Sequence, residues 1–295
     1  MSYKNHRYTE LQTSEGFTLI RMTSSGLYNF LTPENELLSN RIFRNAKPFK
    51  HGFARVQLLN ENWCFLKTDG SFINEEEYRS AYNFHNGFAM VEIFQKGWNF
   101  LKKDGTLLSE TYFMQVRDFE SGVAWVKTKD DSWNILKEDG TLIIVEEKIR
   151  DFWNFSEGFA NVCTDINKWT YVDINGKILT NERYLRTLEF TNGLGVVRRS
   201  IHEYNFVTPN GNLLCEEWYY NAPLFTGGVW LVERADRTCN FVKSDGTLLS
   251  EKWFDSADDF VDGIALVRIN GKYNYLTLDG TLLRDNWDDT TVNSQ

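Results

Sequence analysis

The chain has 295 residues, a formal net charge of −9 and 42% hydrophobic residues. The acidic balance disfavours general nucleic-acid binding, which requires a basic face. No run of 18 apolar residues occurs, so the sequence predicts no membrane-spanning helix.

The cysteines and the first residues indicate a cytoplasmic protein. Cys64, Cys163, Cys215 and Cys239 show neither a C-x-x-C spacing nor a paired arrangement, and a zinc site or disulfide framework would need one. The first seven residues are polar, and no apolar segment of signal-peptide length follows them. We therefore expect reduced thiols, no metal, no cofactor and a cytoplasmic location.

A unit of 35 or 36 residues recurs eight times along the chain. Each unit starts at an anchor glycine, and in seven units a phenylalanine stands three residues before it. The anchors are Gly16, Gly52, Gly87, Gly122, Gly158, Gly193, Gly228 and Gly263. Such a period is typical of architectures in which each unit buries its apolar face against its neighbours. Because no linker interrupts the period, we expect a single repeat domain over residues 1–295.

Within a unit, the pattern predicts an antiparallel meander. The residues after the anchor, such as 53–56, form a short apolar run typical of a buried strand. The next run alternates aromatic and polar residues, as in 169–172, which indicates a second strand with two unlike faces. An Asp-Gly or Asn-Gly pair follows and favours a type I′ hairpin, in which both central residues have positive φ. A third apolar pair, such as 107–108, completes three strands, and the acidic aromatic connector behind it can add a short fourth strand.

In chain order, unit one (16–51) departs most from this pattern, and units two to four (52–157) follow it most closely. We expect the Phe and Gly of the Phe-x-x-Gly segment to be structural, with the Phe filling the space between successive meanders. A second row of equivalent positions, just after the first aromatic of the second strand, holds Asn six times. This row predicts a repeated structural hydrogen bond, with a ligand ladder along a channel as the alternative. The six are Asn29, Asn99, Asn134, Asn205, Asn240 and Asn274.

The pattern Phe-x-x-Gly-Phe-Ala-x-Val, followed by Lys-Trp-x-Tyr-Val-Asp-x-x-Gly-Lys, is complete from Phe155 to Lys177. It resembles the WG (or KWG) repeat family of bacterial proteins, over roughly residues 13–287. One departure is systematic: where the family has a glycine after its tryptophan, this chain has Asn, Cys or Thr. Asn tolerates glycine-like backbone angles, so the implied β-repeat fold is retained. The resemblance supplies no shared catalytic residues.

Two whole-body arrangements agree with the repeat. A propeller-like closed ring and an open β-solenoid both bury meanders against their neighbours. An open solenoid needs polar caps at its ends, whereas the last unit keeps a full apolar set, including Tyr273, Tyr275 and Leu276. The sequence therefore favours the ring, with the solenoid as the alternative.

The sequence favours a non-enzymatic binding or scaffolding module. No nucleophile elbow, zinc-protease helix motif or phosphate-binding loop occurs, and the recurring carboxylates are turn aspartates. The alternative is a hydrolase or lyase with carboxylates from different units gathered at the centre of the ring.

The variable turns after the first strands predict the binding face. Six of them keep a constant length while their composition differs in every unit, and binding residues concentrate on loops held by a rigid scaffold. They are 57–62, 92–97, 127–132, 163–168, 198–203 and 233–238. We expect the following residues to contact a protein or another acidic ligand, with the oligomeric state left open: Arg198, Arg199, His202, Arg234, Arg237 and, as an aromatic contact, Trp125. For Trp125, core packing is the alternative.

Overall fold

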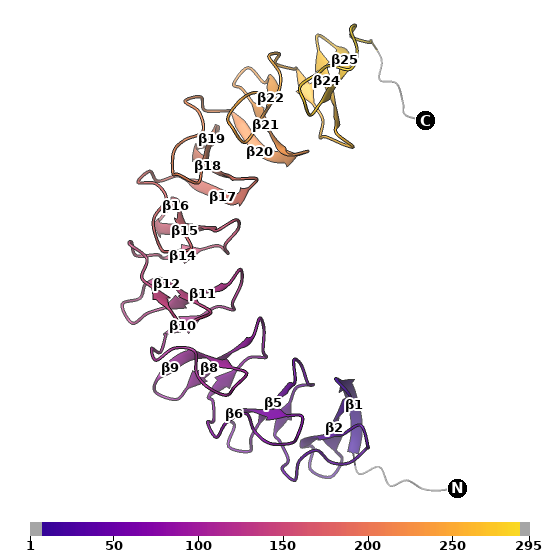
Figure 1. Ribbon diagram of the computed structural model, residues 1–295, viewed down its shortest axis with the longest axis vertical. Coiled ribbons are helices and arrows are strands. Elements are labelled where there is room, and N and C mark those ends of the chain that lie inside the picture. The colour runs from indigo at the N-terminus through magenta and orange to yellow at the C-terminus, as the bar shows by residue number, and fades with distance from the viewer. Residues whose placement is uncertain (1–7, 290–295) are drawn as a thin grey trace, which may run out of the picture. The chain divides into compact units, whose positions relative to one another are not determined.

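The computed structural model describes residues 8–289, apart from the side chain of Pro223, and contains 25 strands and no helix in that range. The strands form eight small antiparallel sheets, one after another along the chain (Figure 1). The prediction of an all-β chain with eight meander units is confirmed. The chain divides into two compact units, Met1–Ile144 and Val145–Gln295, which are described separately. The polar residues 1–7, on which the prediction of no signal peptide rested, lie outside the described residues.

The unit Met1–Ile144 contains four sheets. In sequence order their strands are β1 (Tyr8–Ser14), β2 (Phe17–Met22) and β3 (Tyr28–Leu31); β4 (Asn45–Ala46), β5 (Phe53–Gln57) and β6 (Trp63–Lys67); β7 (Ser80–Ala81), β8 (Phe88–Ile93) and β9 (Gly97–Lys102); and β10 (Gln115–Val116), β11 (Val123–Lys127), β12 (Trp133–Lys137) and β13 (Leu142–Ile143).

The unit Val145–Gln295 contains four more sheets, each of three strands. They are β14 (Asp151–Phe152), β15 (Phe159–Asp165) and β16 (Lys168–Asp173); β17 (Arg186–Thr191), β18 (Leu194–Ser200) and β19 (Glu203–Val207); β20 (Asn221–Thr226), β21 (Val229–Glu233) and β22 (Cys239–Val242); and β23 (Ser256–Ala257), β24 (Ile264–Ile269) and β25 (Lys272–Thr277).

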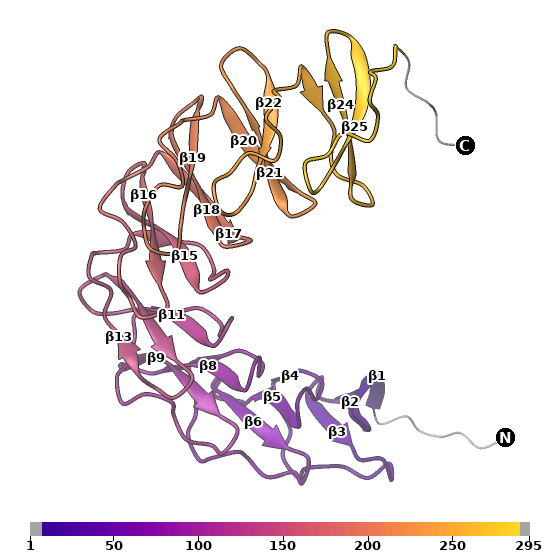
Figure 2. The same ribbon diagram turned by 45° about the horizontal axis from the view of Figure 1, so that its top comes forward.

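The first strand of each sheet lies before the anchor glycine, in the connector of the preceding unit. In the second sheet, for example, β4 pairs with β5 and β5 with β6 (Figure 2). The apolar pair after the Asp-Gly turn makes only a single bridge in most units, such as Leu101 to Leu107, and forms a strand only as β13. Seven of the eight sheets have the predicted three strands. The connector strand, predicted as an optional fourth, is present in every sheet, whereas the post-turn pair forms a strand only in the four-stranded sheet that contains β13.

The type I′ turn was predicted at the Asp-Gly pair, but it occurs at the anchor glycine. The type I′ hairpin lies at the anchor: His51 and Gly52 have φ of 56° and 84°, and the residues on either side, Lys50 and Phe53, bond each other's backbone at 2.9 and 3.3 Å. At the Asp-Gly turn, only the glycine has positive φ, 86° at Gly105. There the Gly105 N–H donates to Lys102 O at 3.0 Å, which makes a three-residue loop with a glycine bulge.

The turn glycine also lies close to the backbone of the preceding unit. A Cβ on Gly105 would lie 2.7 Å from the carbonyl oxygen of Ile73 in the preceding unit, and one on Gly140 would lie 2.6 Å from that of Leu108. A Cβ on the anchor Gly52 or Gly87 would meet nothing within 4 Å. The anchor therefore needs glycine for its backbone angle, and the Asp-Gly turn needs it for both angle and space.

The phenylalanine of the Phe-x-x-Gly segment fills the space between successive sheets, as predicted. Phe119 is 1% exposed, and its ring centroid lies 4.4 Å from that of Phe88 and 4.8 Å from that of Phe100. Both partners belong to the preceding sheet. The same arrangement recurs where Phe190 stacks on Phe159 at 4.3 Å and meets Tyr171 edge-on at 4.9 Å.

The asparagine row is structural, as predicted. Asn99 is fully buried; its Nδ2 donates to the carbonyls of Ser109 and Thr111 at 2.7 and 3.1 Å, and its Oδ1 accepts from the Phe100 N–H at 2.8 Å. Asn205 and Asn240 repeat this set of bonds. The amide thus ties the second strand to the connector, and the ligand-ladder alternative fails for these residues because their amides already have backbone partners.

We predict that Phe119→Ala lowers the free energy of unfolding by ~3–5 kcal/mol, because it leaves a cavity between two sheets. Phe94 is 66% exposed and serves as the control, since Phe94→Ala removes the same ring from the surface. Urea denaturation of both variants measures the difference. A stability change near zero for Phe119→Ala would refute the packing role.

Candidate functional site

The predicted basic residues lie on two neighbouring loops of the unit Val145–Gln295. Arg198 and Arg199 lie near the end of β18, and His202 lies in the turn to β19. Arg234 and Arg237 lie in the turn from β21 to β22. We call these two turns and their flanking residues the basic loops.

Tyr220 joins the two basic loops. The His202 ring stacks on Tyr220 with centroids 3.9 Å apart and an interplanar angle of 10°, and the Arg237 guanidinium carbon lies 3.9 Å from the same tyrosine centroid. Two groups this close cannot share one face of the ring, so Tyr220 lies between them. Its hydroxyl is 3.0 Å from His202 Nε2 and accepts from Arg237 Nη2 at 2.8 Å. One histidine and one arginine from different repeats are thus fixed to one ring.

Two further arginines lie over tryptophan rings of the connectors. The guanidinium carbon of Arg199 is 4.1 Å from the Trp218 ring centroid, and that of Arg234 is 3.7 Å from the Trp253 centroid. Both distances are well inside the range of cation–π attraction. Stacking holds the long arginine side chains in one orientation at the surface, which reduces the entropy that a partner has to overcome.

Glutamates balance much of this charge. Glu203 accepts from Arg199 at 2.7 Å, Glu233 accepts from Arg237 at 2.9 Å, and Glu217 accepts from Nε and Nη2 of Arg234 at 2.8 and 3.2 Å. These hydrogen bonds raise the pKa of all three arginines. The basic loops are therefore a pre-ordered, nearly neutral cluster of guanidinium groups and not a strongly positive patch.

Arg198 takes a different position from the other arginines. It is half-buried on β18, pairs across the sheet with Arg186 of β17, and lies 3.4 Å from the Tyr204 hydroxyl through Nη1. The structure thus groups Arg199, His202, Arg234 and Arg237 around connector aromatics, with Arg198 at the edge of the group.

Trp125 lies in β11, in the other compact unit, and is 3% exposed. This burial agrees with the alternative role, which is core packing. The residue keeps its predicted place in the strand but presents almost no surface to a partner.

Sequence analysis missed the connector residues that hold the basic loops, namely Glu217, Trp218, Tyr220 and Trp253. A signal was present: Trp218 stands 19 positions after Arg199, and Trp253 stands 19 positions after Arg234, so the same pair recurs in successive units. Recognising it required knowing that the connector folds back beside the turn after the first strand.

The recurring aspartates act locally. Asp104 Oδ1 accepts from the hydroxyl and the backbone N–H of Thr106, at 2.7 and 2.9 Å, and these bonds lower the pKa of its carboxyl. Asp69 and Asp245 make the same contacts with Ser71 and Thr247. They shape the loops, as predicted, although they do so without positive φ.

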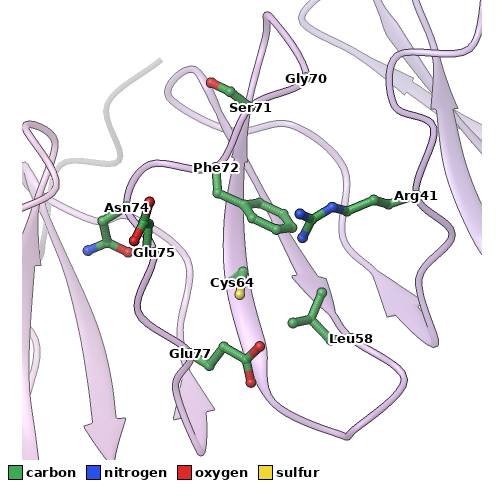
Figure 3. A pocket seen from close by; sticks show the side chains of 9 residues that line it. All are labelled: Arg41, Leu58, Cys64, Gly70, Ser71, Phe72, Asn74, Glu75 and Glu77. Carbon is green, nitrogen blue, oxygen red and sulfur yellow. The ribbon is translucent and has the colours of Figure 1, made fainter.

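A hollow of about 490 Å³ lies beside Cys64 in the unit Met1–Ile144. Figure 3 shows the Arg41 guanidinium facing the Phe72 ring, whose centroid is 4.8 Å from the guanidinium carbon. Cys64 occupies the asparagine row, and its thiol approaches only Glu76 O, at 3.8 Å. Burial raises the pKa of this thiol to about 12, so it stays protonated and is a poor nucleophile near neutral pH.

Residues 8–289 contain no helix long and apolar enough to cross a membrane. Within the same range, no group of three or more His, Cys, Asp or Glu side chains is arranged to hold a metal ion.

We predict that the native protein reacts slowly with a thiol-specific reagent at pH 8. Burial raises the pKa of Cys64 to about 12 and that of Cys239 to about 11, whereas a free thiol titrates at about 8.5. The unfolded chain therefore loses these protons first, and the free energy of unfolding falls as pH rises above about 8.5. Peptide mapping after labelling gives the rate at each cysteine. Labelling of Cys64 as fast in the native protein as in urea would contradict this.

Comparison with known proteins gives one family match and several distant structural likenesses. Three of the similar solved structures are the designed protein Ika8 (15% identity, 94% of this chain and 95% of that chain, TM-score 0.33), BamB from Moraxella catarrhalis (9%, 93% and 98%, 0.29) and the WD40 β-propeller domain of Doa1 (11%, 89% and 86%, 0.28). With TM-scores below 0.5, these likenesses carry no argument here. No curated protein matches the sequence. Residues 241–273 match the model described as a WG containing repeat. The predicted resemblance to the WG repeat family is thereby confirmed over these residues, which match a WG containing repeat.

Proposed function

We propose that the protein is a non-enzymatic binding module of the cytoplasm, and that its basic loops bind an acidic segment of a partner protein. The observation that carries this proposal is the stacking of Arg199, Arg234 and Arg237 on connector aromatics. Three guanidinium groups from two adjacent repeats are held in fixed orientations at the surface. Fold maintenance does not require arginine at these turn positions, since other repeats have different residues there.

The chemistry of arginine supports a carboxylate-bearing partner. A guanidinium has five N–H donors in a planar fork that matches a carboxylate or phosphate. Glu203 occupies only one nitrogen of Arg199, and Glu217 occupies two nitrogens of Arg234. An acidic segment adds bonds to the remaining donors or replaces the internal glutamates. Exposed ion pairs contribute about 0–1 kcal/mol each, so the replacement costs little.

The proposed binding surface is limited to residues of the basic loops. Trp125 is not included in the proposed surface, because it is 3% exposed. The recurring aspartates accept hydrogen bonds within their own loops and so do not favour the enzyme alternative.

The binding test compares proteins captured from the native cell by wild type and by a variant in which Arg198, Arg199, Arg234 and Arg237 are all changed to Glu. We expect the variant to lose the acidic partner, and the wild-type complex to weaken at high salt. A matched variant changes Arg44, Arg79 and Arg150 to Glu, since these are also exposed arginines in ion pairs. We expect it to behave as wild type.

A second variant separates misfolding from lost contacts. Changing the same four arginines to Gln removes the charge without placing new carboxylates beside Glu203, Glu217 and Glu233. Thermal denaturation shows whether each variant is folded. If the folded variants recover the same partners in the same amounts as wild type, the basic loops are not the binding face.

For the body as a whole we propose the closed ring, with an open solenoid as the alternative. Small-angle X-ray scattering distinguishes the two. A compact particle of 295 residues has a radius of gyration of about 19 Å, and a closed ring of small sheets stays near that value. A clearly larger radius, with a long tail in the distance distribution, would favour the open solenoid.

A further inference from the structure

The hollow beside Cys64 lies in the N-terminal compact unit, between two successive connectors and the turn from β5 to β6. Its volume of about 490 Å³ is in the range of small-molecule sites. Arg41 comes from the connector before β4, Glu77 from the connector before β7, and Leu58 from the turn. Figure 3 shows the Arg41 guanidinium and the Glu77 carboxylate at opposite ends, with Cys64 and Leu58 between them.

The hollow lies where unit six has a stacked arginine and tryptophan. Leu58 stands six positions after its anchor glycine, as Arg199 does in unit six. Glu77 precedes the connector residue that bridges to β6, as Trp218 precedes the one that bridges to β19. In the seven units that form this bridge within the described residues, the position holds Ile42, Glu77, Tyr112, Arg183, Trp218, Trp253 and Trp287. Unit two alone among them has a carboxylate there, and it lacks the indole that packs against the turn in unit six.

Arg41 presents a guanidinium without an anionic partner. Its guanidinium carbon lies 4.8 Å from the Phe72 ring centroid, and the side chain makes no hydrogen bond or ion pair with residues 8–289. The aromatic ring holds the guanidinium by cation–π attraction but satisfies none of its five N–H donors. These donors therefore remain available to an anion in the hollow.

Glu77 presents a carboxylate that the neighbouring turn fixes in place. Its Oε2 accepts from Asn60 Nδ2 at 2.7 Å and from Asn62 Nδ2 at 2.8 Å, whereas its Oε1 has no hydrogen-bond partner among the described residues. The bond from Asn62, and next the bond from Asn60, lowers the pKa of this carboxyl, so it is ionised near neutral pH. Its second oxygen is left to accept from a cation.

The two charges are opposite, but they do not pair with each other. Arg41 is held on Phe72, and Glu77 is held by the turn asparagines, so neither side chain reaches the other. Both charges still act on Cys64 between them. Burial is the main cause that raises the pKa of this thiol to about 12, Glu77 adds to the rise, and Arg41 opposes it. A fixed cation and a fixed anion across one hollow match a ligand that carries both charges.

We propose that this hollow binds a free α-amino acid with an apolar side chain. The α-carboxylate matches the planar fork of Arg41, and the α-ammonium donates to the second oxygen of Glu77. The apolar side chain packs against Leu58 and Phe72, which are both partly exposed in the wall. Glu75 also lines the hollow, so a simple amine is the competing ligand and has to be measured beside the amino acid.

The probes are L-leucine, L-methionine and L-phenylalanine, each titrated into the full chain and followed by isothermal calorimetry. We expect saturable binding of at least one of them. The same titration with its deaminated and its decarboxylated analogue, isocaproate and isoamylamine in the case of leucine, tests whether both charges are needed. Each analogue lacks one charge-assisted contact, so it should bind about tenfold or more weakly than the amino acid.

Arg41→Gln and Glu77→Gln test the two contacts separately. Each should weaken binding of the amino acid about tenfold or more. In Arg41→Gln the amino acid should bind no better than its amine, and in Glu77→Gln no better than its deaminated acid, whereas a purely structural role would leave these preferences unchanged. The controls are Arg79→Gln and Glu76→Gln, which change exposed residues nearby that do not line the hollow. Both should bind as wild type does.

Filling the hollow gives an independent test. The double variant Leu58→Arg/Glu77→Trp places in unit two the pair that unit six has at Arg199 and Trp218. We expect it to remain folded in thermal denaturation and to lose amino-acid binding; if it does not fold, the two Gln variants decide.

Three results would overturn the proposal. The first is that none of the three amino acids binds saturably to wild type. The second is that the amine alone binds as tightly as the amino acid. The third is that the folded Gln variants, or the folded double variant, bind as tightly as wild type.

Discussion

The interlock between successive sheets is the interaction on which this molecule depends. A sheet of three short strands cannot bury enough apolar surface alone. Several units therefore place a phenylalanine such as Phe119 against two rings of the preceding sheet, and a turn glycine such as Gly105 or Gly140 lies against a carbonyl of the preceding unit. The first contact supplies apolar burial, and the second fixes the spacing. Together they keep the repeat at 35 or 36 residues, and they leave the turns between the second and third strands of each sheet free to vary.

The sequence predicted the repeat, the two principal strands, the Phe insertion and the structural role of the asparagine row. These features are local and recur in six to eight of the units, so their periodicity is visible. Which glycine makes the type I′ turn could not be read from Asp-Gly pairs. The three-residue loop uses the same residues, and the choice is made by the approach of the preceding unit at Ile73 or Leu108. The connector strand was predicted only as an optional fourth strand for a similar reason, since Asn45 and Ala46 look like connector until β5 pairs with them.

The candidate site was only partly predictable. Variable charge at Arg199, Arg234 and Arg237 was visible, but the stacking and the internal glutamates depend on how the connector folds back. There the repeat provides a constant frame, and the turn residues vary on it.

The central claim, that the basic loops form the binding face, is tested most directly by site-specific photo-crosslinking in the native cell. A photoreactive phenylalanine replaces Ile201, which is 68% exposed between β18 and β19, or Leu59, which is 59% exposed on the corresponding loop between β5 and β6. The account predicts discrete crosslinked products from position 201, lost when Arg199, Arg234 and Arg237 are changed to Gln, and none from position 59. Equal crosslinking from both positions, or products that persist without the arginines, would contradict it.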